Sequence, residues 1–578
     1  MTRFAAAAIL AVCVPLAGAA QTADAIYHNG RVVTVNDRFD VVQAIAVKDG
    51  RIQAVGTSDA VRALAGPDTR IVDLGGRTLL PGFSDNHIHL GEELQPWKGG
   101  MIGAVPEWLR GAGDVEALVE ALRRQASRTP AGEWIRGEIA REDWGNQRVP
   151  TRRHLDRAAP DHPVAIARGP HTLLLNSAAL AKAGITRETP NPPGGWIFRD
   201  DKGEPTGRVL EAARRMVTRV MPPEPRTGGD EARLALYRTQ LAQIAAMGIT
   251  SINVASVRPG DFRLIQRLYA RWGEELPRAT LQLRLSPGHD TYDDPEEGVR
   301  VSIHEMEALG VHTGFGNDRL KIGAIKMSID GGLSAPVFWS LKPYKGRPGF
   351  FGAQRIPTEA FYRVAKRAHE LGWQTGTHVM GDAAVVMVVD KLEKILRAQP
   401  RADHRHYLHH VAVLPPEATL EKMARLGIGV ASQPGFTVGL GAYAEEALDP
   451  DREATQNPTK SLLDRGIRVS YGSDGGPYGP LVALYAAVTR RGWDDKVRGA
   501  SEAVDIRTAI RLHTLEPAYM TFDEKTRGSV DVGKAADFVV LGADILTIDP
   551  LRLREVPIER TIVGGREIHA APSPASQP

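Results

Sequence analysis

The sequence predicts an α/β fold: a (β/α)8 TIM barrel with a composite β-sandwich domain formed by both chain ends and a large insertion after the first barrel strand. Three observations support this prediction. Apolar strand candidates alternate with amphipathic helix candidates through most of the chain, hairpin patterns occur near both ends, and a long excursion interrupts the alternation early.

The length of the chain agrees with this architecture. Its 578 residues exceed the usual size of one domain, about 100 to 200 residues, but a barrel with an appended domain accommodates them. We expect the β-sandwich domain to comprise residues 21–76 and 515–572, and the barrel domain residues 77–514, of which 91–225 form the insertion. Residues 573–578 are expected to be a disordered tail.

Residues 1–20 have the layout of a secretory signal peptide. One charge, Arg3, precedes an apolar run that is too short to cross a bilayer comfortably, and small residues follow it. We therefore expect cleavage and a periplasmic or secreted protein. The only cysteine, Cys13, lies in this leader, so the mature chain would contain no disulfide and no cysteine ligand for a metal. An acylated Cys13 is the less favoured alternative because the bulky Val12 precedes it.

The charge balance argues against polyanionic partners. Lys and Arg number 72 against 69 Asp and Glu, and no long run of one sign occurs. We expect no nucleic-acid and no membrane partner, and a small-molecule substrate instead. A homo-oligomer is compatible with this composition.

Both ends of the chain have the pattern of β-structure. Near the N-terminus, the turn Asp49-Gly50 separates apolar runs at 44–47 and 52–55, which is a strong hairpin signal. Near the C-terminus, 537–541 is a strand candidate, and Gly564-Gly565 separates two further candidates. We expect these two half-sheets to pack together.

Between the ends, strand and helix candidates alternate. Several helices stop at a glycine that suits the left-handed cap of a helix, namely Gly248, Gly372, Gly427 and Gly466. The strand candidates are 78–83, 250–255, 281–285, 320–325, 374–377, 406–410, 429–432 and 468–472. Eight such units predict a closed barrel. The excursion over 91–225 is too long for a loop and is expected to be structured.

The first strand candidate leads into a His-x-His pair, His87 and His89. Two imidazoles with this spacing at a strand end can reach one metal ion, and open sites built from imidazole activate water for hydrolysis. The pair alone is weak support for a metal site because His404 and His406 repeat the spacing. Solvated or hydrogen-bonded histidines are the common alternative.

Further candidates follow other barrel strands, where barrel enzymes place their reactive groups. They are Lys326 after the fourth strand, His378 after the fifth, His409 and His410 at the sixth, and Asp474 after the eighth. Asp474 could instead be an ordinary turn carboxylate in its glycine-rich segment.

With these residues in place, the chain resembles the metal-dependent amidohydrolase superfamily, specifically amidohydrolase family 3, which contains N-substituted formamide deformylases. The resemblance covers nearly all of the predicted mature chain. Beyond the strand-end residues, it rests on WIRG at 134–137, NSAAL at 176–180, GEPTG at 203–207, HVMGD at 378–382 and GKAAD at 533–537. Together these segments are highly specific, whereas each alone is weak.

The resemblance implies a centre of one or two divalent ions, most commonly zinc. His87 and His89 would bind one ion, and His378 with His410 would bind the second. Asp474 would bind metal and serve as the catalytic proton shuttle.

Lys326 matches the position where the family can carry a carboxylated lysine that bridges two ions. This modification requires a neutral amine, so burial or nearby positive charge must lower the lysine pKa. The alternative is an ordinary lysine paired with Asp330.

Two further assignments are less direct. Successive side chains on a strand face opposite ways, so we expect only one of His409 and His410 to point into the barrel. The family has Glu-His at this place, which makes His410 the ligand and His409 a hydrogen-bonding neighbour. By the same resemblance, His171 is catalytic and hydrogen-bonds the substrate carbonyl oxygen, unless it is a structural histidine of the insertion.

We therefore expect a metal-dependent hydrolase that cleaves an amide-like, non-peptide or N-acyl carbon–nitrogen bond of a small molecule through a metal-activated hydroxide. One alternative keeps the metal site but cleaves an ester or lactone. The other is a catalytically silent periplasmic binding or regulatory protein, because a fold does not fix a function.

Overall fold

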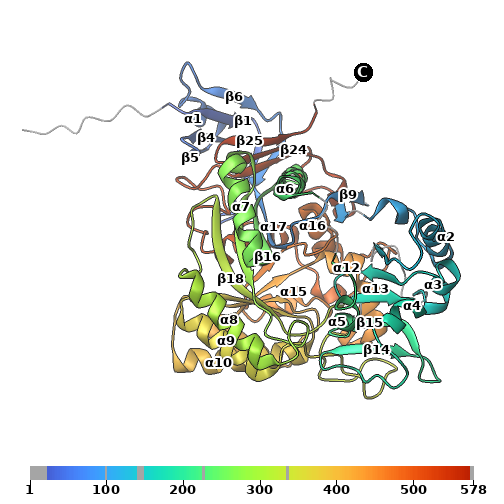
Figure 1. Ribbon diagram of the computed structural model, residues 1–578. Helices are drawn as coiled ribbons and strands as arrows, with labels where there is room; N and C mark the ends of the chain where they lie inside the picture. The colour runs from blue at the N-terminus through green and yellow to red at the C-terminus, as the bar shows by residue number, and fades with distance from the viewer. Residues whose placement is uncertain are drawn as a thin grey trace, which may run out of the picture.

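The computed structural model describes residues 22–97, 100–103, 105–139, 149–223, 228–333 and 337–572. The expected leader, 1–20, and the expected tail, 573–578, lie outside the described residues. Figure 1 shows a β-domain at the top of the view, the barrel below it and the insertion at the side.

Eight parallel strands form the barrel sheet, in the order β22-β21-β20-β19-β18-β17-β16-β8. Their bounds are β8 (Phe83–Ile88), β16 (Ile249–Val257), β17 (Arg278–Arg284), β18 (Leu320–Ser328), β19 (Thr375–Val379), β20 (Tyr407–His410), β21 (Gly429–Ser432) and β22 (Val469–Tyr471). The predicted (β/α)8 barrel is confirmed.

Helices connect the strands and bury their apolar faces against the barrel. They are α6 (Asp230–Ala246), α7 (Pro259–Trp272), α8 (Pro295–Leu309), α9 (Thr358–Glu370), α10 (Asp382–Ala398), α11 (Glu417–Leu426) and α15 (Thr459–Leu463), followed after β22 by α16 (Pro480–Thr489), α17 (Ile506–Leu512) and α18 (Leu515–Met520). The four glycines predicted to end helices all have positive φ. No helix in the described ranges is both long and apolar enough to span a bilayer.

The predicted first barrel strand, 78–83, is wrong in its bounds. Residues 78–81 form β7 (Thr78–Pro81), which pairs with β2 (Arg31–Val33) and β23 (Phe538–Leu541) in the β-domain. The barrel strand begins at Phe83 and includes His87. Both strands are buried, and the apolar stretch 79–83 crosses their junction, so the sequence pattern does not mark the change of sheet.

The β-domain is a sandwich of two sheets that share one apolar core, which includes Tyr27, Ile45 and Phe538. One sheet has the order β5-β4-β1-β6 and the other β25-β24-β23-β7-β2-β3, so the second joins both ends of the chain. Their remaining strands are β1 (Ala25–His28), β3 (Val41–Val42), β4 (Ala44–Lys48), β5 (Arg51–Gly56), β6 (Arg70–Asp73), β24 (Ile558–Val563) and β25 (Arg566–Ala570). Both predicted hairpins, β4–β5 and β24–β25, are antiparallel pairs.

The insertion has a sheet of its own, in the order β11-β12-β13-β15-β14. Its elements are β9 (Leu94–Trp97), β10 (Gly100–Gly103), α2 (Val115–Ala126), β11 (Ile135–Glu138), α3 (Arg152–Ala158), β12 (Val164–Arg168), β13 (Thr172–Leu175), α4 (Ser177–Lys182), β14 (Gly195–Arg199), β15 (Pro205–Glu211) and α5 (Arg214–Thr218). Leu210 of β15 packs in one cluster with Leu333, Phe338 and Phe436 from loops that follow barrel strands. The insertion therefore docks on the end of the barrel where barrel enzymes have their sites.

The barrel closes where β22 meets β8, and the contacts there are mostly polar. Asp474 N donates to His87 O at 2.6 Å, and Asn86 Nδ2 donates to Ser470 Oγ at 2.6 Å. Gly472 approaches β8 so closely that a Cβ on it would lie 2.5 Å from the backbone nitrogen of His87. The absence of a side chain at Gly472 thus allows the closure that brings Asp474 to the histidines of β8.

The second His-x-His pair, His404 and His406, lies at the opposite end of the barrel strands and is structural. His406 Nδ1 accepts from the backbone N–H of Thr375 at 3.0 Å, so its Nε2 carries the proton that is donated to His369 Nδ1 at 2.9 Å. The remaining nitrogens of His369 and His404 reach the backbone oxygens of Gln399 and Leu426. All three rings are satisfied as neutral imidazoles, which leaves no lone pair for a metal.

We predict that replacing Gly472 by Ala lowers the free energy of unfolding by about 1–3 kcal/mol, because the added methyl group must displace β8. Gly260→Ala is the matched control, since a Cβ at Gly260 in α7 has no neighbour within 4 Å. Urea denaturation of both variants measures the effect. Equal stability of the two variants would contradict the close approach.

We also predict that the histidine network makes folding less stable below about pH 6.5. Burial lowers the pKa of His369, His404 and His406, whereas the same groups in the unfolded chain titrate near 6.5. The stability that the neutral rings contribute is complete above that value and falls as the pH drops, because the unfolded chain takes up the protons. His406→Gln should be less stable at pH 8 but lose less stability than the unmodified protein between pH 8 and pH 5.5 in urea denaturation. An unchanged pH dependence would refute this role.

Candidate metal centre

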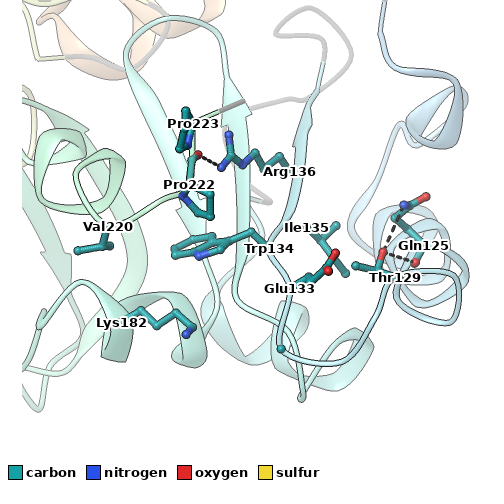
Figure 2. A pocket seen from close by; sticks show the side chains of 11 residues that line it. Gln125, Thr129, Glu133, Trp134, Ile135, Arg136, Lys182, Val220, Pro222 and Pro223 are labelled. Carbon is teal, nitrogen blue, oxygen red and sulfur yellow. Dashed lines mark hydrogen bonds between the residues drawn. The ribbon is translucent and has the colours of Figure 1, made fainter. Parts of the chain in front are cut away.

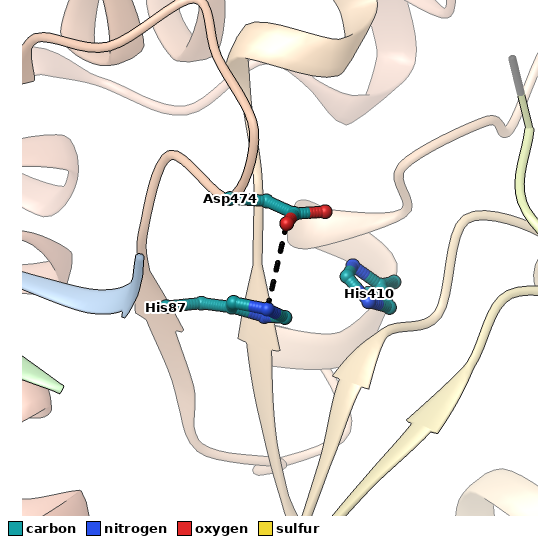
Figure 3. A group of neighbouring side chains, drawn as sticks. All are labelled: His87, His410 and Asp474. Carbon is teal, nitrogen blue, oxygen red and sulfur yellow. Dashed lines mark ion pairs between the residues drawn. The ribbon is translucent and has the colours of Figure 1, made fainter. Parts of the chain in front are cut away.

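Side chains in or just after three barrel strands, the first (β8), the last (β22) and β20, meet at the C-terminal ends of the strands. Figure 3 shows His87, His410 and Asp474 beside one another. One ligand atom from each lies within 4.8 Å of the others. Asp474 Oδ1 is 3.5 Å from Nε2 of His87 and 3.0 Å from Nε2 of His89. At these distances, four of the predicted ligands lie close enough together to bind one ion.

His378 and Lys326 extend the cluster along the barrel. The ring centroid of His378 lies 4.4 Å from that of His410. Lys326 is 2% exposed on the adjacent strand β18, and no described residue is a hydrogen-bond partner of its Nζ. The six residues predicted to bind metal are therefore gathered at one place.

The alternative in which Lys326 pairs with Asp330 does not occur. Asp330 is fully buried and accepts hydrogen bonds from three backbone N–H groups, those of Trp339, Met380 and Gly381. Its Oδ1 lies 3.6 Å from His378 Nε2. Burial raises the pKa of Asp330 to about 7 against the effect of these hydrogen bonds.

Burial favours the neutral form of the basic groups in the cluster. It lowers the pKa of His87 and His378 well below the usual range, and it lowers the pKa of His410 to about 3. It also lowers the pKa of Lys326 to about 7, although the carboxylate of Asp474 opposes the shift. Neutral imidazoles and a neutral amine have the lone pairs that a metal ligand needs.

Several of these lone pairs have no protein partner. The buried nitrogens without a hydrogen bond in the described part of the chain include His87 Nδ1, His378 Nε2, His410 Nε2 and Lys326 Nζ. An unsatisfied buried polar atom costs about 1–3 kcal/mol. Neutral nitrogens without hydrogen bonds beside the Asp474 carboxylate are expected of residues that hold a cation, so the residues fit a divalent metal with nitrogen and oxygen ligands.

Gln433 fixes the tautomer of His410. Its Nε2 donates to Ala431 O at 3.0 Å, so its Oε1 is free to accept from His410 Nδ1 at 2.6 Å. The proton of His410 is therefore on Nδ1, and the lone pair of Nε2 is left for the centre. Such neighbours orient metal ligands and raise their basicity.

His409 and His410 both approach His87, with ring centroids 4.2 Å and 4.9 Å from it. The expectation that only one of them points inward is therefore wrong. His410 and Val411 have φ of 75° and 54°, and this left-handed turn breaks the alternation of an extended strand. His409 Nε2 is 2.9 Å from Gln282 Oε1, as expected of a hydrogen-bonding neighbour.

Asp85 ties the two closing strands together beside the ligands. Its Oδ1 accepts from the backbone N–H groups of His87 and Ser473, both at 3.1 Å, and its Oδ2 accepts from Ser473 Oγ at 2.5 Å. Burial raises the pKa of Asp85 to about 6, while these hydrogen bonds oppose the shift. Asp85 thus fixes the backbone on both sides of the predicted ligands His87 and Asp474.

His171 lies beside this group rather than in it. Its ring centroid is 6.4 Å from that of His378, and its Nδ1 is 2.6 Å from Glu211 Oε1. The insertion thus contributes a side chain to the edge of the site, at the position where the sequence predicted a substrate contact.

The sequence prediction missed some supporting residues. Some of them had a signal in the sequence, and others did not. Gln433 directly follows barrel strand β21, so a search of all strand ends would have found it. Asp85 lies two residues before His87 and was visible in the same motif. Gln282 and Glu211 lie within strands, and no local pattern distinguishes them.

A separate cavity of about 920 Å³ lies in the insertion. Figure 2 shows the residues that line it. Trp134, Arg136 and Lys182 line it, and Arg136 donates a hydrogen bond to the backbone oxygen of Pro222. None of its lining residues belongs to the histidine cluster, so this cavity is not the candidate metal centre.

Comparison with known proteins agrees with the site. A model of the amidohydrolase family matches residues 70–569. The chain is 30% identical over 561 residues to YtcJ of Bacillus subtilis, covering 94% of this chain and 99% of that protein. It is also 30% identical over 551 residues to the N-substituted formamide deformylase of Arthrobacter pascens, covering 94% and 98%.

The fold has a counterpart among solved structures. An uncharacterized metal-dependent hydrolase from Pyrococcus horikoshii superposes with a TM-score of 0.65 at 23% identity, covering 91% of this chain and 99% of that one. The matched family region includes the complete barrel and all the candidate ligands. The chain therefore belongs to the amidohydrolase family and is a hydrolase that acts on carbon–nitrogen bonds.

Proposed function

We propose that this hydrolase is metal-dependent and cleaves an amide-like, non-peptide or N-acyl carbon–nitrogen bond of a small molecule. The observation that supports this most directly is the meeting of His87, His410 and Asp474 within 4.8 Å at the mouth of the barrel. We further propose that the metal is zinc, because the donors are imidazole nitrogen and carboxylate oxygen with no sulfur.

The residues that would hold the metal are distributed over five strand ends. His87, His89 and Asp474 would surround one ion, and His378 with His410 would hold a second, with Lys326 between them. When bound, such ions act as a Lewis acid and lower the pKa of water.

Asp474 is positioned to move the proton of the reaction. Its carboxylate contacts His87 in β8 and His89 just after it, and 19% of this side chain remains exposed at the mouth. It would accept a proton from the attacking water and later donate it to the nitrogen of the leaving amine. An amine leaves poorly unless it is protonated, so one group that does both steps suits an amide substrate.

The name of one relative supports a substrate class. We propose a substituted formamide or another N-acyl amine, because the Arthrobacter pascens relative is named for N-substituted formamides. An ester or lactone remains a competing substrate for the same site. Export, inferred from residues 1–20, would make the substrate an extracellular or periplasmic compound.

We predict that His87→Ala and His378→Ala each lower the zinc content and abolish turnover, because each removes a ligand that the remaining groups cannot replace. Elemental analysis and hydrolysis assays on panels of formamides, N-acyl amines, esters and lactones measure both effects. His312→Ala is the control, since His312 is exposed and lies beside Gly372, before β19 begins, away from the C-terminal ends of the strands.

Asp474→Asn should lower kcat by about 100- to 10,000-fold because the amide cannot accept the proton. Turnover of this variant at the original rate would remove Asp474 from the proton transfer. Zinc-loaded protein that hydrolyses nothing on the panel before or after chelation would instead favour a silent binding protein.

Lys326→Met should reduce the number of zinc ions bound per chain and leave the protein folded, since the replacement keeps an apolar stem in the barrel and removes the amine. Elemental analysis and circular dichroism test this directly. A structure of the zinc-loaded protein with a plain lysine tip, and no ion within coordination distance of it, would exclude the bridge.

A further inference from the structure

The insertion presents a carboxylate–imidazole pair, Glu211 and His171, at the rim of the candidate metal centre. His171 immediately precedes β13, and Glu211 ends the neighbouring strand β15. The backbone N–H of Glu211 donates to His171 O at 3.1 Å, which holds the two residues side by side. Their side chains meet with His171 Nδ1 2.6 Å from Glu211 Oε1.

The contact between these side chains is buried and asymmetric. The Glu211 side chain is 2% exposed, whereas that of His171 is 13% exposed. Burial would raise the pKa of Glu211, but the interactions with His171 and Arg355 outweigh it and hold the pKa below its usual value. Glu211 is therefore an ionised acceptor, and the proton in the short contact belongs to His171 Nδ1.

Arg355 contacts the other oxygen of the Glu211 carboxylate. Its Nε lies 3.4 Å from Glu211 Oε2, and its Nη2 lies 2.6 Å from Asp290 Oδ2. The second oxygen of Glu211 is thus engaged by a guanidinium that is itself anchored. Glu211 also has a φ of 49°, a conformation that a residue with a side chain seldom adopts.

The turn that follows the Lys326 strand accommodates the pair. A Cβ on Gly331 would lie 2.6 Å from Glu211 Oε1, and a Cβ on Gly332 would lie 2.5 Å from His171 Nε2. Two consecutive glycines therefore let the insertion place this pair against the barrel. The His171 ring then lies 6.4 Å from that of His378, centroid to centroid.

We propose that Glu211 is a positioning residue: it accepts a hydrogen bond from Nδ1–H of His171 and so leaves Nε2 to accept a hydrogen bond from a substrate bound beside His378, rather than to donate one to its carbonyl oxygen as the sequence predicted. This inference rests on the proposed hydrolysis, because it places a substrate in that space. It adds a part of the site that comes from the insertion, and it gives a role to a buried carboxylate that is not a metal ligand. The interaction resembles the general use of a carboxylate to fix the orientation of a working imidazole.

The first test needs no substrate. Nitrogen-15 spectra of zinc-loaded protein with labelled histidine should show His171 protonated at Nδ1, the resonance being assigned by its absence in His171→Gln. In Glu211→Gln the His171 signals should shift toward the other tautomer, because an amide can also donate. A His171 that carries its proton only on Nε2 in the unmodified protein would overturn the proposal.

The second test is a double-mutant cycle on a substrate found with the panel. Glu211→Gln should lower kcat about 10- to 100-fold, with KM, zinc content and melting temperature little changed. The same substitution in a His171→Gln background should change kcat by no more than about twofold, since Glu211 acts through His171. Equal losses in the two backgrounds would overturn the proposal.

Glu204→Gln is the matched control. Glu204 lies just before β15, pairs with Arg152 at 3.6 Å and is not among the contacts of His171, so this variant should keep the original kcat. Failure of the proposed function would look different from failure of this inference. It would appear as zinc-loaded protein without turnover on any substrate, in which case the tautomer of His171 alone decides the role of Glu211.

Discussion

The candidate centre depends on the closure of the barrel between its first and last strands. β8 and β22 are joined by few backbone contacts, and the seam depends on polar side chains and on Gly472. Because Gly472 has no side chain, β22 approaches β8 closely enough for Asp474 to reach His87 and His89. Asp85 then binds backbone N–H groups of both strands. The same contacts that close the barrel thus assemble the ligands.

Burial then gives these groups their chemical character. Burial shifts the amine and the imidazoles toward their neutral forms where the barrel removes them from solvent, and several of their nitrogens have no hydrogen-bond partner among the described residues. The structural histidines at the other end show the contrast. His406 is equally buried, but each of its nitrogens has a hydrogen-bond partner. Burial alone therefore does not distinguish the candidate ligands from structural histidines. The candidate ligands differ in having nitrogens without a hydrogen-bond partner among the described residues.

Much of the fold and the candidate ligand cluster could be predicted from the sequence because both depend on local signals. The β/α alternation, the helix-ending glycines and the hairpin turns each act over a few residues, and the strand-end rule then locates Lys326, His378 and Asp474. The start of the first barrel strand could not be predicted, since the apolar stretch 79–83 crosses the junction of β7 and β8, which belong to two sheets. The inward turn of both His409 and His410 was also hidden, because it depends on a positive φ at His410.

The insertion was the least predictable part, and this follows from how it contributes to the site. Barrel residues are placed by a repeated pattern, so their positions can be inferred from the sequence. Glu211 and His171 are placed by one docking contact, in which β15 packs on barrel loops and Gly331 and Gly332 leave room for the pair. No periodic pattern in the sequence indicates such a contact. A barrel that keeps its ligands can therefore acquire a new substrate contact through a change in its insertion, because the closure at Gly472 and the metal ligands are unaffected by it.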